Sequence, residues 1–303
     1  MQFRESFCDF GILHDTDRIR FVHHFFFADE TASIVDNSGF LCYNIVQKPH
    51  EKQICSERGQ CCIMNYYVDI HSNLLPELAG LGNRPMTETE AAARISELQE
   101  SNIKQAVAAP YFDPAAMPAE DFLALRDAKL AALAETAPPM RIVGGAVLPF
   151  SYCLAHARAL QPFAVGGSSY FLIDLPAEPI RGTLCEDLSR LRIVSGMCPI
   201  AADADRLFDL WTPEDWIALK QAGILLQISV NGLLRQEHRK LTLYLLVNEY
   251  AHFVATGSRE VEQPLHFADA MRILQRSLPS QNYRRVKNNA GMLLSNAEPS
   301  AFL

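Results

Sequence analysis

The segment NYYVDIHSNLLPELAG, residues 65–80, carries residue types that bind divalent metals. An aromatic and β-branched run leads into Asp69-Ile70-His71, and Asn73 follows two residues after the histidine. Imidazole and carboxylate together suit borderline divalent cations, so the pattern is typical of the first strand of a metal-binding barrel. Asn73 stands where a second histidine would complete a chelating pair. The segment is therefore a working metal site, a damaged one or a coincidence.

The elements that would position these residues form an alternating series after Met64. Most predicted strands are short apolar runs, as expected for parallel strands covered on both faces. Alternation of strands and helices predicts a parallel sheet, and seven strands in about 240 residues favour a closed or nearly closed (β/α) barrel. The predicted strands are Tyr66–Ile70, Gln105–Ala109, Arg141–Leu148, Tyr170–Leu175, Cys198–Ala202, Ile224–Val230 and His252–Thr256.

Two helix starts are marked by capping patterns. Thr87 and Glu90 have the spacing of a capping box, in which each side chain accepts a hydrogen bond from a free backbone donor. Thr212 followed by Pro213 predicts a second start. Four further helices are predicted at Ala119–Glu135, Leu184–Leu191, Glu237–Glu249 and Leu265–Leu278.

The ends of the predicted strands are where chemistry is expected, because barrels of this kind place their active sites at the C-terminal ends of their strands. Here the strand ends carry a mixture of polar, apolar and charged side chains. They are His71, Asn73, Pro110, Tyr111, Val147, Asp174, Asp203, Ser229, Val230, Asn231, Gly257, Ser258 and Arg259.

Composition limits the class of protein. The chain has 303 residues, of which 49% are hydrophobic, enough to bury a large core. A net charge of −8 does not favour binding to nucleic acid. No segment reaches the roughly 18 apolar residues of a membrane span, and the N-terminus lacks the layout of a secretion signal. We expect a cytoplasmic protein in which Cys153, Cys185 and Cys198 are free thiols.

Residues 1–63 differ from the regular pattern of residues 64–303. One interpretation is a separate arm or small N-terminal domain, and another is an irregular extension packed on the barrel. A third, which we favour, is that Met64 is the natural start and the upstream part is a translated leader, because a core strand begins immediately after it.

Residues 64–303 resemble the PHP (polymerase and histidinol phosphatase) superfamily, and most closely its bacterial capsule and exopolysaccharide tyrosine phosphatases. The order of the motifs is kept along nearly all of this part of the chain. The matching segments are Val68–Asn73 with Leu75-Pro76, Thr87–Glu90, Ala109–Phe112, Gly145–Val147, Leu172–Asp174, Pro199–Leu207, Leu226–Gly232 and Ala255–Arg259. The resemblance implies a distorted seven-stranded (β/α) barrel with an N-terminal extension.

The resemblance also implies a cluster of divalent metals, manganese or a similar ion, held by histidines and carboxylates. Of the ligand positions, only His71 is unchanged, while Asp174 replaces glutamate and Asp203 replaces histidine. These three residues are the candidate metal ligands, as remnants of the site. Arg259 places a permanent positive charge where a ligand is expected, and it could form a salt bridge with Asp174 or Asp203. No cofactor is then expected, or at most a divalent ion such as manganese or zinc.

Two functions follow from this resemblance. The first is a catalytically impaired regulatory or binding homologue in polysaccharide biosynthesis, whose partner would be a tyrosine kinase or a phosphotyrosine peptide. The alternative is an active metal-dependent phosphotyrosine phosphatase or phosphoesterase with a reduced, single-metal site on His71, Asp174 and Asp203. In that case Arg206 or Arg259 would contact the phosphate.

Overall fold

The computed structural model describes residues 65–78, 85–136, 140–178, 182–257 and 264–303. The chain divides into two units, Met1–Ile54 and Cys55–Leu303, and all the described residues lie in the second. The predicted leader or extension, residues 1–63, lies outside them. None of the described helices is long and apolar enough to cross a membrane.

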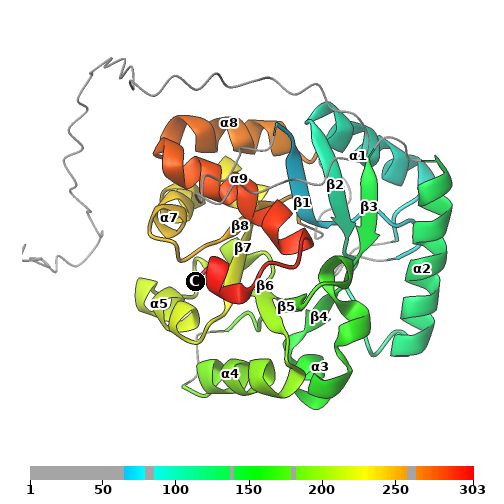
Figure 1. Ribbon diagram of the computed structural model, residues 1–303, viewed down its shortest axis with the longest axis horizontal. Coiled ribbons are helices and arrows are strands. Elements are labelled where there is room, and N and C mark those ends of the chain that lie inside the picture. Colours follow the sequence, from blue (N-terminus) through cyan, green and yellow to red (C-terminus); the bar gives the residue numbers. More distant parts are fainter. Residues whose placement is uncertain (1–64, 79–84, 137–139, 179–181, 258–263) are drawn as a thin grey trace, which may run out of the picture. The chain divides into compact units, whose positions relative to one another are not determined.

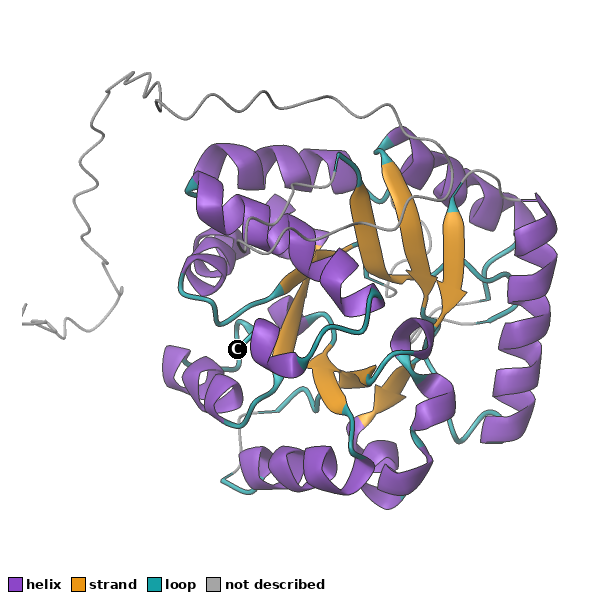
Figure 2. Ribbon diagram, in the orientation of Figure 1, coloured by secondary structure: helices purple, strands orange, loops and turns teal. Residues whose placement is uncertain are grey.

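The described strands form two parallel sheets rather than one closed barrel (Figures 1 and 2). The first sheet has the order β1-β2-β3, and the second has the order β4-β5-β6-β7-β8. The strands are β1 Tyr67–Ser72, β2 Ile103–Ala108, β3 Arg141–Gly144, β4 Val147–Pro149, β5 Tyr170–Asp174, β6 Cys198–Ala201, β7 Leu225–Ser229 and β8 Phe253–Ala255. The expected α/β fold with parallel pairing is confirmed.

The described strands do not show the expected single closed or nearly closed barrel, and one predicted strand differs from the expectation. The predicted strand Arg141–Leu148 is split at Gly145-Ala146 into β3 and β4, which belong to different sheets. A Cβ on Gly145 would lie 2.9 Å from the Val107 side chain, so the chain passes close to β2 where it changes sheet. Isolated bridges join Tyr111 to Val147 and Ser72 to Gly257, across the two gaps between the sheets.

Helices surround the strands (Figure 2). They are α1 Glu88–Glu100, α2 Ala119–Thr136, α3 Phe150–Ala155, α4 Leu184–Ser195, α5 Pro213–Gln221, α6 Val230–Leu234, α7 Gln236–Val247, α8 Phe267–Ser277 and α9 Ser280–Leu294. Short 3₁₀ turns include η4, Ala204–Leu207, directly after Asp203. The predicted capping box forms at Thr87 with Glu90, and the helix start predicted at Thr212-Pro213 is also observed, with a capping box between Thr212 and Asp215.

The core has two layers. One apolar cluster lies between the strands and the outer helices. A second cluster contains side chains from seven strands together with Ala290, Leu293 and Phe302 from the C-terminal segment. Helix α9 contacts both β1 and β8, the first and last strands, and so covers the place where the two sheets meet through a single bridge. Strands of both sheets therefore share one interior, and their C-terminal ends face the same candidate site.

Candidate functional site

His71 lies at the centre of a buried polar network formed by three strand ends. Its side chain is fully buried, and Nδ1 lies 2.9 Å from Oε1 of Gln227 and 3.4 Å from Oδ1 of Asp203. Gln227 also binds Asp203 directly: its Oε1 accepts a hydrogen bond from the Asp203 backbone N–H at 2.8 Å, and its Nε2 donates to Asp203 Oδ1 at 3.3 Å. The β7 glutamine thus links the imidazole of β1 to the carboxylate after β6.

The protonation of His71 is set by two opposing effects. Burial lowers the pKa of His71, but the Asp203 carboxylate raises it, and the net result is a pKa above the ordinary value. The ring Nε2 has no hydrogen-bond partner in the described structure. One edge of the imidazole is therefore held by Gln227 and Asp203, while the other edge is buried and open to a further polar group.

Asp203 is held in a left-handed backbone conformation, with φ 47°, which aspartate tolerates better than most residues. Gly257, at φ 82°, lies directly opposite: a Cβ there would come within 2.8 Å of Asp203 Oδ1. Glycine at this strand end is what gives the carboxylate its room. The Asp203 side chain makes no capping hydrogen bond to η4, the short turn that follows it.

Asp174, the third candidate ligand, belongs to a different ion pair. Its Oδ1 lies 2.7 Å from Nη2 of Arg206, and both side chains are mostly buried. Nη2 of Arg206 also donates a short hydrogen bond to the Leu175 carbonyl. The salt bridge predicted between Arg259 and Asp174 or Asp203 falls on a residue outside the described ones, so it stays a prediction; among the described residues, Arg206 contacts Asp174. Arg206, expected to contact phosphate, is held by protein groups here.

Asn73, which stands at the second-histidine position, is fully buried, and neither atom of its amide has a described hydrogen-bond partner. Its backbone carbonyl accepts a hydrogen bond at 3.3 Å from Nη1 of Arg94, a buried arginine of α1. Burial lowers the pKa of Arg94 below its ordinary value. A buried guanidinium beside this position is an electrostatic obstacle to a dication.

Three buried polar residues were not predicted as site residues. Asp69 accepts hydrogen bonds from the Thr256 hydroxyl at 2.6 Å and from the Thr256 and His71 N–H groups at 3.2 and 3.1 Å, and a short one from Ser72. Burial raises the pKa of Asp69 even though these donors lower it. Gln227 and Thr256 are the other two. Their signal was present: a polar residue inside an apolar parallel strand must find a partner.

Asp205 was not among the predicted site residues. It is 6% exposed, and its carboxylate accepts hydrogen bonds from Ser229 N–H at 2.6 Å and from the Ser229 hydroxyl at 2.7 Å. Burial and the neighbouring Asp203 raise the pKa of Asp205 to about 6. These residues line a cavity of about 100 Å³ that also receives Arg206, Asn231, Arg235, Gly257 and Leu265.

The fit of these residues to a metal cluster can now be tested. His71 and Asp203 converge, whereas Asp174 is committed to Arg206. Within the described ranges, no group of three or more histidine, cysteine, aspartate or glutamate side chains is arranged to hold a metal ion. Two or three adjacent dications need many such ligands with carboxylates among them to offset the charge. The described residues do not fit a cluster of that kind.

Comparison with known proteins decides the family. A profile described as "Capsular polysaccharide synthesis, CpsB/CapC" matches residues 67–295. The chain belongs to this family. The resemblance drawn from the strand-end motifs is thereby confirmed. No curated protein sequence gives a significant match.

Comparison with solved structures shows which proteins have a fold similar to that of this chain. A crystal-structure study of YwqE from Bacillus subtilis and CpsB from Streptococcus pneumoniae, described as unique metal-dependent tyrosine phosphatases, matches with a TM-score of 0.61 and 20% identity, over 76% of this chain and 95% of that one. Histidinol phosphate phosphatase from Lactococcus lactis, complexed with zinc, L-histidinol and phosphate, matches with a TM-score of 0.42 and 10% identity, over 70% and 93%. The first likeness establishes a common fold for this CpsB/CapC member.

Proposed function

We propose that this CpsB/CapC family member is a catalytically impaired homologue of the metal-dependent tyrosine phosphatases, with a regulatory or binding role in polysaccharide synthesis. One observation carries the proposal: in the contacts of the described residues, the three candidate ligands have different partners. His71 and Asp203 are joined through Gln227, and Asp174 is paired with Arg206 at 2.7 Å. The distorted seven-stranded barrel implied by the family is part of the same proposal.

The electrostatics at the strand ends support this loss. A phosphatase cluster offsets the charge of several dications with carboxylates. Here the Asp174 carboxylate is offset by Arg206, and Arg94 brings a second buried guanidinium beside Asn73. A buried carboxylate–guanidinium pair is costly to separate, on the order of 3–5 kcal/mol when one partner is removed. Moving Asp174 onto a metal would have to overcome this cost.

The site could still bind a ligand without catalysing a reaction. The cavity beside Asp203 is lined by Arg235 and Arg206, which could meet a phosphotyrosine peptide or a tyrosine kinase through charge-assisted hydrogen bonds. Such a partner, and a cytoplasmic location, are inferred from the family.

One observation favours a second candidate function, an active enzyme with a single metal. His71 Nε2 and both amide atoms of Asn73 are buried without a described hydrogen-bond partner. Unpartnered buried polar atoms are costly, and a bound ion or water would relieve them. In that case His71 would offer Nε2 to the ion, and Asp203, which lies on the Nδ1 side of the ring, would have to move to become a second ligand.

The two functions are separated by metal analysis of the purified full chain, followed by a phosphotyrosyl-peptide hydrolysis assay with added manganese or zinc. We expect less than one bound metal per chain and no turnover above background. His71→Ala tests the assignment, and His266→Ala, an exposed histidine on the N-terminal side of α8, is the matched control. Turnover that His71→Ala abolishes and His266→Ala leaves unchanged would refute the impaired-homologue proposal.

A further inference from the structure

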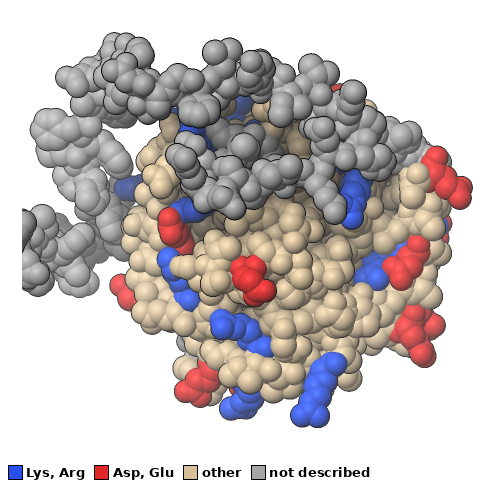
Figure 3. Space-filling model, viewed as in Figure 1, with Lys and Arg blue, Asp and Glu red and all other residues tan. Residues whose placement is uncertain are grey.

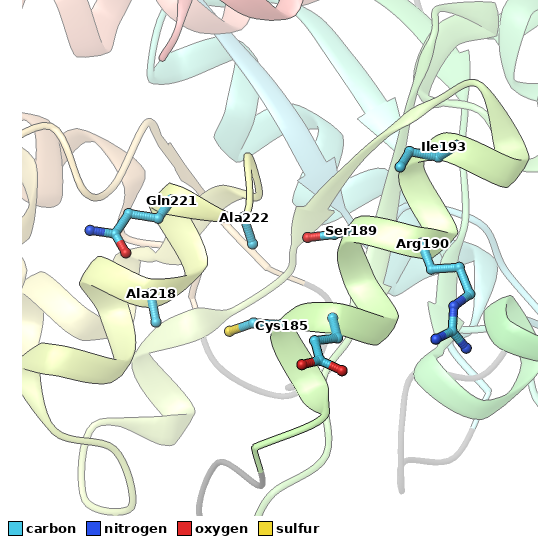
Figure 4. Close-up of a pocket in the computed structure, with 8 residues that line it drawn as sticks. Cys185, Ser189, Arg190, Ile193, Ala218, Gln221 and Ala222 are labelled. Carbon is cyan, nitrogen blue, oxygen red and sulfur yellow. The ribbon is translucent and has the colours of Figure 1, made fainter.

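A second feature lies away from the strand ends, on the outer surface of α4 and α5. A groove of about 620 Å³ runs between these two helices. Cys185 and Ser189 project from α4 towards α5, where Ala218 and Ala222 line the other wall (Figure 4). These four side chains are small, and the longer side chains of Glu186, Arg190, Ile193 and Gln221 complete the lining. The space beside the small residues can admit a side chain from outside.

The outer face of α4 carries the other half of this surface. Leu184, Leu188 and Leu191 turn inward to the core, which leaves Glu186, Arg190 and Ile193 on an outward stripe at helical spacing. Ile193 is 81% exposed, more than any other large hydrophobic side chain among the described residues. Its neighbour Val194 is 42% exposed. Single exposed apolar residues are ordinary, but here Ile193 is itself part of the groove's lining, together with small and charged side chains.

The geometry points to a second copy of this chain as the partner: we propose that the protein forms a two-fold symmetric dimer through antiparallel packing of α4. In a two-fold interface the same patch serves on both subunits and must complement itself. This patch does so in shape, because it holds both a protrusion and a groove. The proposal does not depend on the proposed function.

Charge complementarity fixes the register. If two α4 helices pack antiparallel about Leu188, Glu186 of each copy lies opposite Arg190 of the other, because both are two positions from the centre. Each dimer then has two equivalent ion pairs. Arg190 is available for this, since its side chain is 73% exposed and its contact with Asp187 within the helix is long, at 3.8 Å, a distance worth little at a surface.

The same register places Ile193. It lies five residues from the centre, so it reaches the first turn of the partner's α4, where Cys185 and Ala218 line the groove. A branched aliphatic side chain would fill the space between these small residues and be removed from water. The ion pairs would then set the register, and Ile193 would supply the apolar contact.

The test is sedimentation velocity on the full chain over protein concentrations from about 1 to 100 µM, the range of weak to moderate association. The wild type should sediment as a dimer at the upper end. Ile193→Asp, Glu186→Arg and Arg190→Glu should each raise the dimer dissociation constant at least about tenfold, since they place charge in the groove or like charges opposite each other. Val247→Asp on α7 and Arg276→Glu on α8 are the matched controls and should leave the constant unchanged.

Mixing gives the sharpest outcome. Glu186→Arg alone presents two arginines, and Arg190→Glu alone presents two glutamates, so an equimolar mixture of the two variants should form a heterodimer with both ion pairs restored. The double variant Glu186→Arg/Arg190→Glu should dimerise as the wild type does. A monomer at all concentrations, a dimer that the three α4 variants leave intact, or variants that fail to recombine on mixing would each overturn the proposal.

Discussion

Asp205→Asn is the substitution whose effect the structure defines most closely. The carboxylate is 6% exposed and its pKa is raised from 3.8 to about 6 by burial and by Asp203. The folded protein therefore binds the proton more tightly than the unfolded chain, and folding stability falls as the pH rises through this window. At about 1.4 kcal/mol per pH unit, the ionised form of Asp205 costs folding about 3 kcal/mol above pH 6.

Asparagine keeps the shape and removes the charge. Its carbonyl can accept from the Ser229 N–H, and its amide can donate to the Ser229 hydroxyl, so both contacts at 2.6 and 2.7 Å have a counterpart. Below about pH 4 the wild-type carboxyl is protonated, and the two proteins should have similar free energies of unfolding. Above about pH 6 the variant should be more stable by about 1–3 kcal/mol, part of the gain being offset by the loss of charge-assisted hydrogen bonds.

The measurement is urea unfolding of both proteins at intervals from pH 4 to pH 8. The difference between their unfolding free energies separates Asp205, together with its interaction with Asp203, from the other titrating groups. Asp121→Asn, at an exposed position in the first turn of α2, is the control and should change stability by less than about 0.5 kcal/mol. A variant that is less stable than the wild type at pH 8, or a difference that does not change between pH 4 and pH 6, would refute this assignment.

Two further predictions concern Thr256 and Gly257, the two residues that follow β8. Thr256→Val removes the 2.6 Å hydroxyl donor to the buried Asp69 carboxylate, so it should lower the unfolding free energy by about 1–3 kcal/mol; an unchanged urea midpoint would contradict this. Gly257→Ala imposes a positive φ of 82° on alanine and brings its Cβ to 2.8 Å from Asp203, and it should cost about 1–3 kcal/mol. Gly196→Ala, at φ 68° with open space around it, is the control, and thermal unfolding should show a smaller loss there than at Gly257.

Charge over the surface agrees with the composition. Figure 3 shows acidic and basic side chains interspersed over the face in view, among the described residues. The chain as a whole carries 35 acidic and 27 basic residues. Neither feature provides the basic stripe that a nucleic-acid backbone requires.

Local pattern was sufficient for most of the fold. Predicted strands such as Cys198–Ala202 and Tyr170–Leu175 lie within a residue of β6 and β5, because short apolar runs that are buried on both faces leave little choice of conformation. The capping box at Thr87 and the helix start at Thr212 formed as expected, since both depend on residues at most three positions apart. The free thiols Cys153, Cys185 and Cys198 are also as predicted.

The break between the sheets was not visible in the sequence, because Arg141–Leu148 reads as one apolar run. The division at Gly145-Ala146 depends on the close approach to Val107, a residue almost forty positions earlier. The sequence also did not reveal helix α6, which begins at Val230, where the predicted strand Ile224–Val230 was expected to end.

The sequence by itself determined which polar residues stand at the strand ends. Parallel strands run in the same direction, so their C-terminal ends lie at one edge of the sheet, independent of side-chain identity. Only the tertiary structure decided how those residues pair. His71 meets Asp203 through Gln227, while Asp174 meets Arg206. Pairing depends on distances of a few ångströms between residues that are 24 to 156 positions apart, and no local pattern encodes such distances.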